Sequence, residues 1–114
     1  MTQCLFCGVV RGDIPAKILH RDDRIVAFED INPQAPVHTL LIPVKHIQSL
    51  SEAGEEDREL LGDLLLAAAR LAREGGVDAT GYRVVTNCRE AAGQSVFHLH
   101  VHLLGGRRFA WPPG

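Results

Sequence analysis

Three histidines alternate with aliphatic residues near the end of the sequence. The run reads His-Leu-His-Val-His-Leu-Leu over residues 98–104. In a β-strand every second side chain points to the same face, so His98, His100 and His102 would share one face about 7 Å apart. The aliphatic residues between them would point to the opposite face, where a core can cover them. Three titratable rings on one rigid element are suited to chemistry.

This pattern is compatible with three roles. The simplest is a set of surface histidines on an exposed sheet face. A His-x-His pair on a strand can also chelate zinc together with a third ligand from elsewhere. The interpretation that we favour is nucleophilic catalysis at a phosphorus centre, in which a neutral imidazole attacks, carries the group covalently and is freed by water. Neighbouring rings would then stabilise the charge on the phosphoryl oxygens and protonate the leaving group.

A polar loop over residues 88–95 leads directly into the histidine run. Its last three residues, Gly93, Gln94 and Ser95, offer backbone amides, a carboxamide and a hydroxyl, which are donors suited to phosphate oxygens. A plain polar turn between two strands would explain the same residues equally well. The loop therefore supports a phosphate site only in combination with the histidines.

Two of the three cysteines, Cys4 and Cys7, form a Cys-x-x-Cys pair. This spacing is typical of metal ligands, but a tetrahedral site needs two further ligands. Free thiols or an adventitious disulfide are the alternatives. Three cysteines make a poor disulfide framework and suit a reducing compartment.

The strongest periodicity in the chain predicts a long amphipathic helix over residues 55–73. Acidic residues at its start, arginines near its end and Gly75-Gly76 beyond it agree with the polarity of a helix and with a glycine stop. The residues expected on its buried face are Leu60, Leu61, Leu64, Leu65, Ala68, Leu71 and Ala72.

The other expected elements are shorter. In chain order they are a short helix over residues 6–11 and strands over residues 24–31, 38–44, 82–87 and 97–104, with a turn at 32–36 between the first two strands. Two strands, a long helix and two more strands favour an α+β domain in which the helix packs on an antiparallel sheet.

Composition sets the outer limits of this interpretation. The chain has 114 residues, 46% of them hydrophobic, 23% charged, and a formal net charge of -2. These values predict a single globular domain over residues 1–114. The charge is unlike that of a protein that binds a nucleic acid polymer or an anionic membrane. With no apolar run near 20 residues and no signal-peptide layout, we expect a cytoplasmic protein.

With these motifs in place, the chain resembles the histidine triad (HIT) superfamily, and within it the nucleotide-binding branch of adenosine phosphoramidases. The resemblance rests on the triad at 98–104 and on Ile-Pro-Ala-Lys at 14–17, Asp-Ile-Asn-Pro-Gln-Ala-Pro at 30–36, Gly-Gln-Ser-Val at 93–96, Gly-Gly-Arg at 105–107 and Trp-Pro-Pro-Gly at 111–114. It implies a five-stranded antiparallel sheet with one long and one short helix. It also implies a homodimer with a continuous ten-stranded sheet, joined through the long helix and the C-terminal tail.

The activity implied by this resemblance is that of a purine nucleoside phosphoramidase. Such an enzyme hydrolyses the P–N bond of adenosine 5'-phosphoramidates through a covalent nucleotidyl-histidine intermediate. A dinucleoside polyphosphate hydrolase or nucleotidylyl transferase would use the same nucleophile with another leaving group. A nucleotide-binding interaction module is a rival of a different class, and a zinc hydrolase with the triad as ligands is a further one.

The resemblance also implies a role for each site residue. His100 would be the nucleophile, His102 would bind and polarise the phosphate, and His38 would help to orient the nucleophile. Asp30 would hold the ribose hydroxyls, which suits a carboxylate that can accept from both. Phosphate or leaving-group contacts are expected from Asn87, Gly93, Gln94 and Ser95, and contacts with the base from Phe6, Val9, Phe28, Ile31 and Leu40.

Some bacterial members of the superfamily complete a Cys-x-x-Cys pair with two histidines. The matching ligand set is Cys4, Cys7, His46 and His98, and it implies a structural Zn²⁺ and no organic cofactor. A His98 that binds zinc cannot also be a free proton donor. Protonation of the leaving group would then come from Ser95 or from water.

Overall fold

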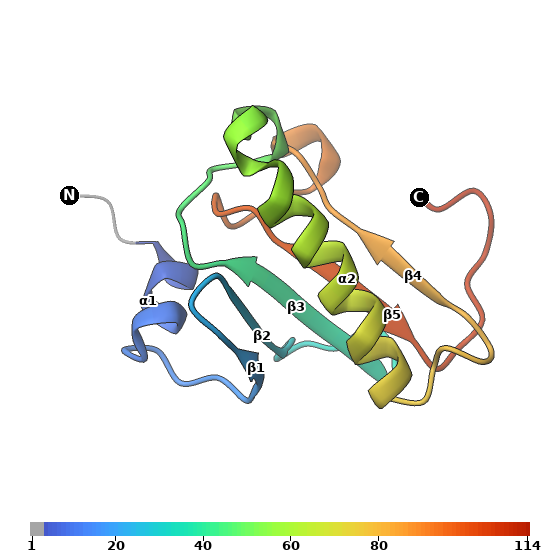
Figure 1. Ribbon diagram of the computed structural model, residues 1–114. Coiled ribbons are helices and arrows are strands. Elements are labelled where there is room, and N and C mark those ends of the chain that lie inside the picture. The colour runs from blue at the N-terminus through green and yellow to red at the C-terminus, as the bar shows by residue number, and fades with distance from the viewer. Residues whose placement is uncertain (1–3) are drawn as a thin grey trace.

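The computed structural model describes residues 4–114. Five strands form one antiparallel sheet in the order β1-β2-β3-β5-β4 (Figure 1). In chain order the helices and strands are α1 (Leu5–Arg11), β1 (Ile18–Arg21), β2 (Ile25–Glu29), β3 (Val37–Pro43), α2 (Arg58–Glu74), β4 (Tyr82–Val85) and β5 (Val101–Gly105), with short 3-10 turns at Leu50–Glu52, Glu55–Asp57 and Glu90–Ala92. The predicted α+β class, with a five-stranded antiparallel sheet and one long and one short helix, is confirmed.

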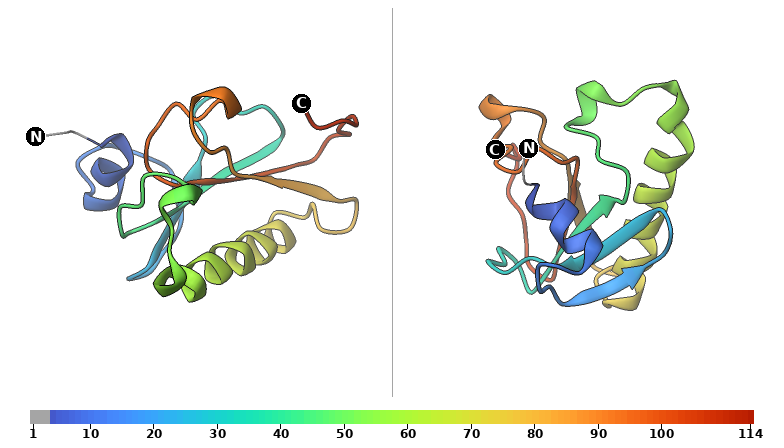
Figure 2. Two further views of the ribbon diagram at one scale, coloured as in Figure 1. Left: turned by 90° about the horizontal axis from the view of Figure 1, so that it is seen from above. Right: turned by 90° about the vertical axis from the view of Figure 1, so that its left-hand side faces the viewer.

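Helix α2 covers one face of the sheet, and α1 lies on the other (Figure 2). The central strands β2 and β3 are buried on both faces and divide their side chains between two cores. Ala27 and Leu41 pack toward α2, whereas Phe28 and Leu40 pack in the cluster that contains residues of α1. This period-2 division places the even-numbered side chains of β3 on the α1 face.

Helix α2 confirms most of the predicted amphipathic pattern. Leu60, Leu64 and Leu71 are buried against the sheet. The α-helix begins three residues later than expected, because residues 55–57 form a 3-10 turn. Leu65, predicted to be buried, is 57% exposed, because one residue beyond Leu64 is a rotation of about 100° around the helix.

Strand boundaries differ from the prediction most at the histidine run. Strand β5 begins at Val101, not at residue 97, and its pairing with β3 ends at the Leu41–Val101 pair. Before it the chain leaves the sheet, and Leu99 N–H donates to Ile47 O at 2.6 Å. The prediction that all three histidines stand on one regular strand is therefore wrong, and only His102 lies within β5.

The sequence pattern alone also missed β1. This strand lies at the edge of the sheet, and most of its side chains are exposed, so it carries no alternation of buried and exposed positions to recognise. Within residues 4–114, no helix combines the length and apolarity that crossing a bilayer would require.

Candidate functional site

The sheet brings a fourth histidine to the triad. His38 on β3 and His102 on β5 lie on neighbouring strands, and their ring atoms Nε2 and Nδ1 are 2.9 Å apart. The rings of His100 and His102 have centroids 5.1 Å apart. Three imidazoles, from residues 38, 100 and 102, therefore form one group on the α1 face of the sheet.

Hydrogen bonds determine which nitrogen carries the proton in two of these rings. The Gln34 backbone N–H donates to His38 Nδ1 at 3.0 Å. A neutral His38 must then carry its proton on Nε2, which donates to His102 Nδ1. In His102 the remaining proton is on Nε2, so this ring presents an N–H donor. Gln34 contributes only its backbone, which is why its side-chain identity gave no sign of this role.

Burial keeps both rings uncharged near neutral pH. Burial, followed by the nearby His100 and His38 rings, lowers the pKa of His102 to about 4, although Asp30 acts in the opposite direction. Burial likewise lowers the pKa of His38, again opposed by Asp30. A neutral His102 fits the tautomer that the hydrogen bonds require, because a protonated ring would have to donate from Nδ1 as well.

His100 has the complementary arrangement. Its Nδ1–H donates to the backbone carbonyl of His98 at 2.7 Å, which leaves the lone pair of the neutral ring on Nε2. The edge-to-face contact with Phe6, with centroids 5.1 Å apart at 85°, packs against the ring, and Thr86 Oγ1–H donates to the His100 carbonyl at 2.8 Å. The result is a buried, oriented imidazole in the form that a nucleophile needs. No pattern in the sequence indicated this role of Thr86.

Asp30 lies next to this group. One carboxylate oxygen accepts the Asn32 backbone N–H at 2.8 Å, and the other is 3.4 Å from His38 Nε2. The turn thus orients the carboxylate toward the histidines. Its expected contact with ribose hydroxyls remains a prediction.

The loop before the histidine run is tied together by Gln94, which is buried. Its Oε1 accepts the Arg89 N–H at 2.6 Å, and its Nε2 donates to the carbonyls of Gln48 and Val96 at 2.8 and 3.1 Å. Arg89 has φ 70° and ψ -178°, a conformation that costs a residue other than glycine about 1–3 kcal/mol. The carboxamide that was expected to contact phosphate is engaged by these backbone groups, and its contact with phosphate remains a prediction.

Other loop residues remain accessible. Ser95 lines a cavity of about 640 Å³ together with Cys4, Leu5, His46, Gln48, Val96 and Phe97. Gly93 has φ 92°, which favours glycine because it has no Cβ. Asn87 is half-buried and follows Thr86, whose hydroxyl binds the His100 backbone. The predicted phosphate contacts of these three residues are not tested by this geometry.

The predicted base-contact residues separate into two groups. Phe6, Val9, Phe28 and Leu40 are buried in one apolar cluster, with the Phe6 and Phe28 rings 5.6 Å apart. Ile31 stands apart from them and is 96% exposed. The first four residues, called the apolar wall below, include Phe6, whose ring packs edge-on against His100.

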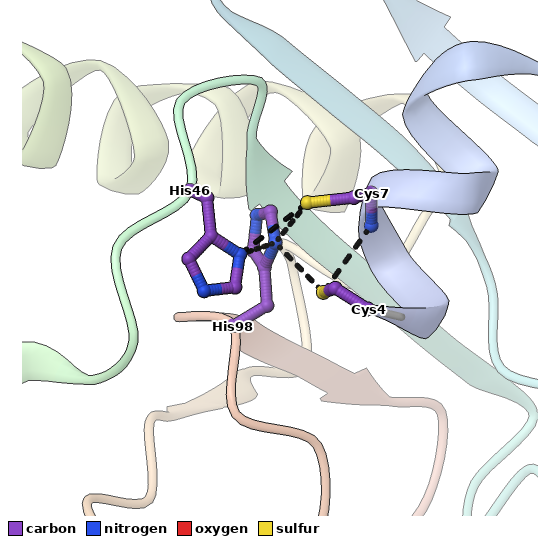
Figure 3. Close-up of side chains that lie close together, drawn as sticks. All are labelled: Cys4, Cys7, His46 and His98. Carbon is purple, nitrogen blue, oxygen red and sulfur yellow. Dashed lines mark hydrogen bonds between the residues drawn. The ribbon is translucent and has the colours of Figure 1, made fainter. Parts of the chain in front are cut away.

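The four predicted metal ligands converge although they come from three distant parts of the chain (Figure 3). His98 Nδ1 lies 3.4 Å from Cys4 Sγ, 3.5 Å from Cys7 Sγ and 3.1 Å from His46 Nδ1. The Cys7 Sγ to His46 Nδ1 distance is 3.3 Å. The ligand atoms therefore lie close enough together to hold one metal ion.

Both the distances and the proton positions fit a metal. Tetrahedral zinc bonds imply separations of about 3.3 Å between two nitrogens and about 3.6 Å between nitrogen and sulfur. His98 Nε2 donates to Pro43 O at 2.8 Å, so the lone pair of the neutral ring is on Nδ1. One ring nitrogen has a single lone pair and cannot hydrogen-bond three neighbours at once. The Cys7 N–H donates to Cys4 Sγ at 3.4 Å, an interaction that would stabilise a thiolate.

Comparison with known proteins adds independent findings. The family profile described as "HIT domain" matches residues 11–109. The chain is 52% identical over 110 residues to an uncharacterized HIT-like protein from Synechocystis, covering 96% of each chain. It is 48% identical to the crystal structure of a HIT family hydrolase from Legionella pneumophila, with a TM-score of 0.97, covering 98% of this chain and 100% of that one. A HIT family hydrolase from Clostridium thermocellum is 44% identical, with a TM-score of 0.93 and 96% of each chain covered.

A test of the loop compares two glutamine substitutions. Gln94→Ala removes a side chain that satisfies three backbone groups, so we expect the free energy of unfolding to fall by about 2–4 kcal/mol. Gln48→Ala keeps the backbone carbonyl that Gln94 contacts, so this substitution should change the free energy of unfolding by less than about 0.5 kcal/mol. Urea unfolding measures both. Equal effects of the two substitutions would contradict the assigned role of Gln94.

A second test uses the depressed pKa of His102. Between about pH 6.5, its ordinary value, and about pH 4, the unfolded chain binds a proton that the folded chain excludes. This ring therefore makes the protein less stable as the pH falls through that window, whereas its contribution is complete above it. Between pH 7 and pH 4 the free energy of unfolding should fall in both proteins. We expect the fall to be about 1–2 kcal/mol smaller in His102→Gln than in wild type, after allowance for solvent screening of a half-buried ring.

The measurement is urea unfolding at several pH values, together with ¹⁵N NMR titration of the imidazoles. A His102 ring that titrates near 6.5, with the same acid slope in the variant, would show that the ring is not held neutral.

Proposed function

This chain belongs to the HIT domain family, and from that premise we propose that it is a purine nucleoside phosphoramidase. Its solved relatives are named hydrolases, and the proposed reaction is hydrolysis of the P–N bond of an adenosine 5'-phosphoramidate. The observation that carries the proposal is the 2.7 Å hydrogen bond from His100 Nδ1 to the His98 carbonyl. It leaves Nε2 unprotonated, and an attacking nitrogen must be unprotonated.

The reaction has two steps. His100 Nε2 attacks phosphorus as the P–N bond breaks, and the amine leaves with a proton supplied by Ser95 or by water. Water then attacks the phosphorus of the nucleotidyl-imidazole and gives up a proton to Ser95 or to solvent, which restores the donor used in the first step. The nucleoside monophosphate leaves as the P–N bond to His100 breaks and Nε2 regains its lone pair. The Nε2–H of a neutral His102 would donate to a phosphoryl oxygen in both steps, which favours the charge that develops there.

The nucleotide would occupy the space between the acidic and apolar residues of the site. Asp30 would accept from the ribose hydroxyls, and the apolar wall of Phe6, Val9, Phe28 and Leu40 would contact the base, with Ile31 closing over it. Little in an apolar wall distinguishes adenine from guanine. The choice between a phosphoramidase and a dinucleoside polyphosphate hydrolase or nucleotidylyl transferase depends on the leaving group, since the nucleophile would be the same.

We also propose that Cys4, Cys7, His46 and His98 hold a Zn²⁺ ion. Four protein ligands leave no open position for a water or a substrate, which is typical of a structural ion. The ion would join the start of α1 to the loop after β3 and to the chain before β5. Zinc in this position supplies cross-linking, not chemistry on the substrate.

The protein is further proposed to act as a homodimer. Strand β4 is an edge strand with Val84 38% exposed, α2 carries the exposed Leu65 and Leu66, and Trp111 near the C-terminus is 83% exposed. Pairing of two β4 edges would extend the sheet and cover apolar surface.

Sedimentation equilibrium tests the dimer. Wild type should show about twice the 12.5 kDa chain mass. Val84→Arg should reduce the mass to that of one chain, because a guanidinium would be buried without a partner. An unchanged mass in the variant would move the interface away from β4.

The covalent step is tested by intact mass spectrometry after rapid quenching. With an adenosine phosphoramidate, wild type should show a transient adduct of one adenylyl group, and His100→Ala should show none and lose most of kcat. Asp30→Ala should form the adduct but with a KM raised about tenfold, since it loses a ground-state contact. Two results would rule out these roles. One is hydrolysis without an adduct under any quench, and the other is the same change of kcat and the same change of KM in His100→Ala and Asp30→Ala.

A further inference from the structure

The metal centre and the nucleophile share one residue. His98 directs Nδ1 toward the two cysteines and His46, while its backbone carbonyl accepts the Nδ1–H of His100. The ring is held from its other side by Pro43 O at 2.8 Å. With both ring nitrogens engaged, the position of the His98 backbone, and with it the acceptor for His100, depends on the metal ligands.

A second link runs through α1. Cys4 caps this helix and Cys7 lies in its first turn, so both sulfur ligands hold its N-terminal end. Phe6 lies between them in sequence, and its ring packs edge-on against His100, with centroids 5.1 Å apart, and against His98 at 6.1 Å. A helix of seven residues has little stability of its own. Its place over His100 therefore depends on its tertiary anchors.

A third link runs through the loop after β3, which supplies His46. The next residue is Ile47, whose carbonyl accepts the Leu99 N–H at 2.6 Å. Leu99 lies between His98 and His100 in the sequence. The carbonyl of Gln48 accepts from Gln94, whose side chain ties together the loop over residues 88–95. The ligand His46 thus begins a segment that contacts both the histidine run and the loop with Ser95.

We propose that the metal centre positions the nucleophile, with Phe6 as the positioning residue that transmits its effect through α1. Loss of the metal would free the start of α1 and the His98 backbone, and the imidazole of His100 would lose its fixed tautomer and orientation. Attack on phosphorus would then slow, although no metal ligand touches the substrate. The catalytic part of this inference rests on the proposed phosphoramidase function and on zinc as the ion.

The main test uses Cys4→Ser with Cys88→Ser as the matched control. Serine is a favoured N-cap residue, so Cys4→Ser keeps the cap of α1 while it removes a sulfur ligand. Cys88→Ser removes the thiol that lies outside the cluster. We expect Cys4→Ser to lose bound zinc, measured by elemental analysis, and to form the adenylyl adduct about 10–100 times more slowly at saturating substrate. Cys88→Ser should match wild type in both.

The tautomer of His100 provides a readout that does not need activity. In ¹⁵N NMR of the zinc-loaded protein, His100 should appear as the single Nδ1-protonated form, and in Cys4→Ser as an average of both tautomers. The same tautomer and the same rate with and without zinc would overturn the proposal. A wild-type protein that forms no adduct at all would refute the proposed function, whereas the tautomer would still test the positioning.

A second variant keeps the metal and removes only the aromatic contact. Phe6→Leu should retain zinc and fold normally, yet form the adduct about tenfold more slowly at saturating substrate. This variant decides the matter if Cys4→Ser fails to fold. A change confined to the Kd of the nucleotide would assign Phe6 to the base wall alone and overturn its positioning role.

Discussion

The hydrogen bond between the His100 ring and the His98 backbone is the interaction on which the site depends. A neutral imidazole has one proton and one lone pair, and the carbonyl 2.7 Å away takes the proton. The lone pair is then on the nitrogen that can attack. The two residues are only two positions apart in the chain. The bond nevertheless forms only because the chain leaves the sheet before Val101 and turns the His98 ring away from the other two histidines.

Backbone hydrogen bonding also sets the proton positions in the other two rings of the site, His38 and His102. A backbone N–H from the 32–36 turn fixes the tautomer of His38, which fixes that of His102. Burial lowers the pKa of both rings, so the arrangement persists at neutral pH without a counter-charge. His100 thereby presents an unprotonated ring nitrogen and His102 presents an N–H donor, and the backbone groups that set this arrangement do not depend on the side chains of their residues.

The fold explains why these backbone groups are available. The helix α2 covers one face of the sheet and buries the aliphatic residues of β5, which leaves the other face to the histidines. On that face α1 is short, and the cluster of Cys4, Cys7, His46 and His98 lies at its start. Such a layout places the larger apolar cluster under α2, and the histidine rings and the predicted metal ligands on the α1 side.

Several features followed from the sequence because they depend on local patterns. The alternation of residues 98–104 indicated a strand with histidines on one side and Leu99, Val101 and Leu103 in the core, and those three aliphatic residues are buried with α2. The period of residues 55–73 indicated the long helix, since burial of one face imposes 3.6-residue spacing. The predicted set of four metal ligands and the role of His38 came from family resemblance, because no spacing rule connects residues 4, 46 and 98.

Tertiary structure decided what local patterns cannot express. It turned His98 out of the row of histidines and placed its Nδ1 beside the sulfur atoms at the start of α1 and beside His46 in the loop after β3. It directed Gln94 inward, where its carboxamide accepts from the Arg89 N–H and donates to two backbone carbonyls. It also left Leu65 in solvent and hid β1 from prediction. The sequence by itself determined which chemical groups the protein has. The tertiary contacts of His98 with Pro43 and of His38 with His102 determined how the rings are oriented and which ring nitrogens carry protons.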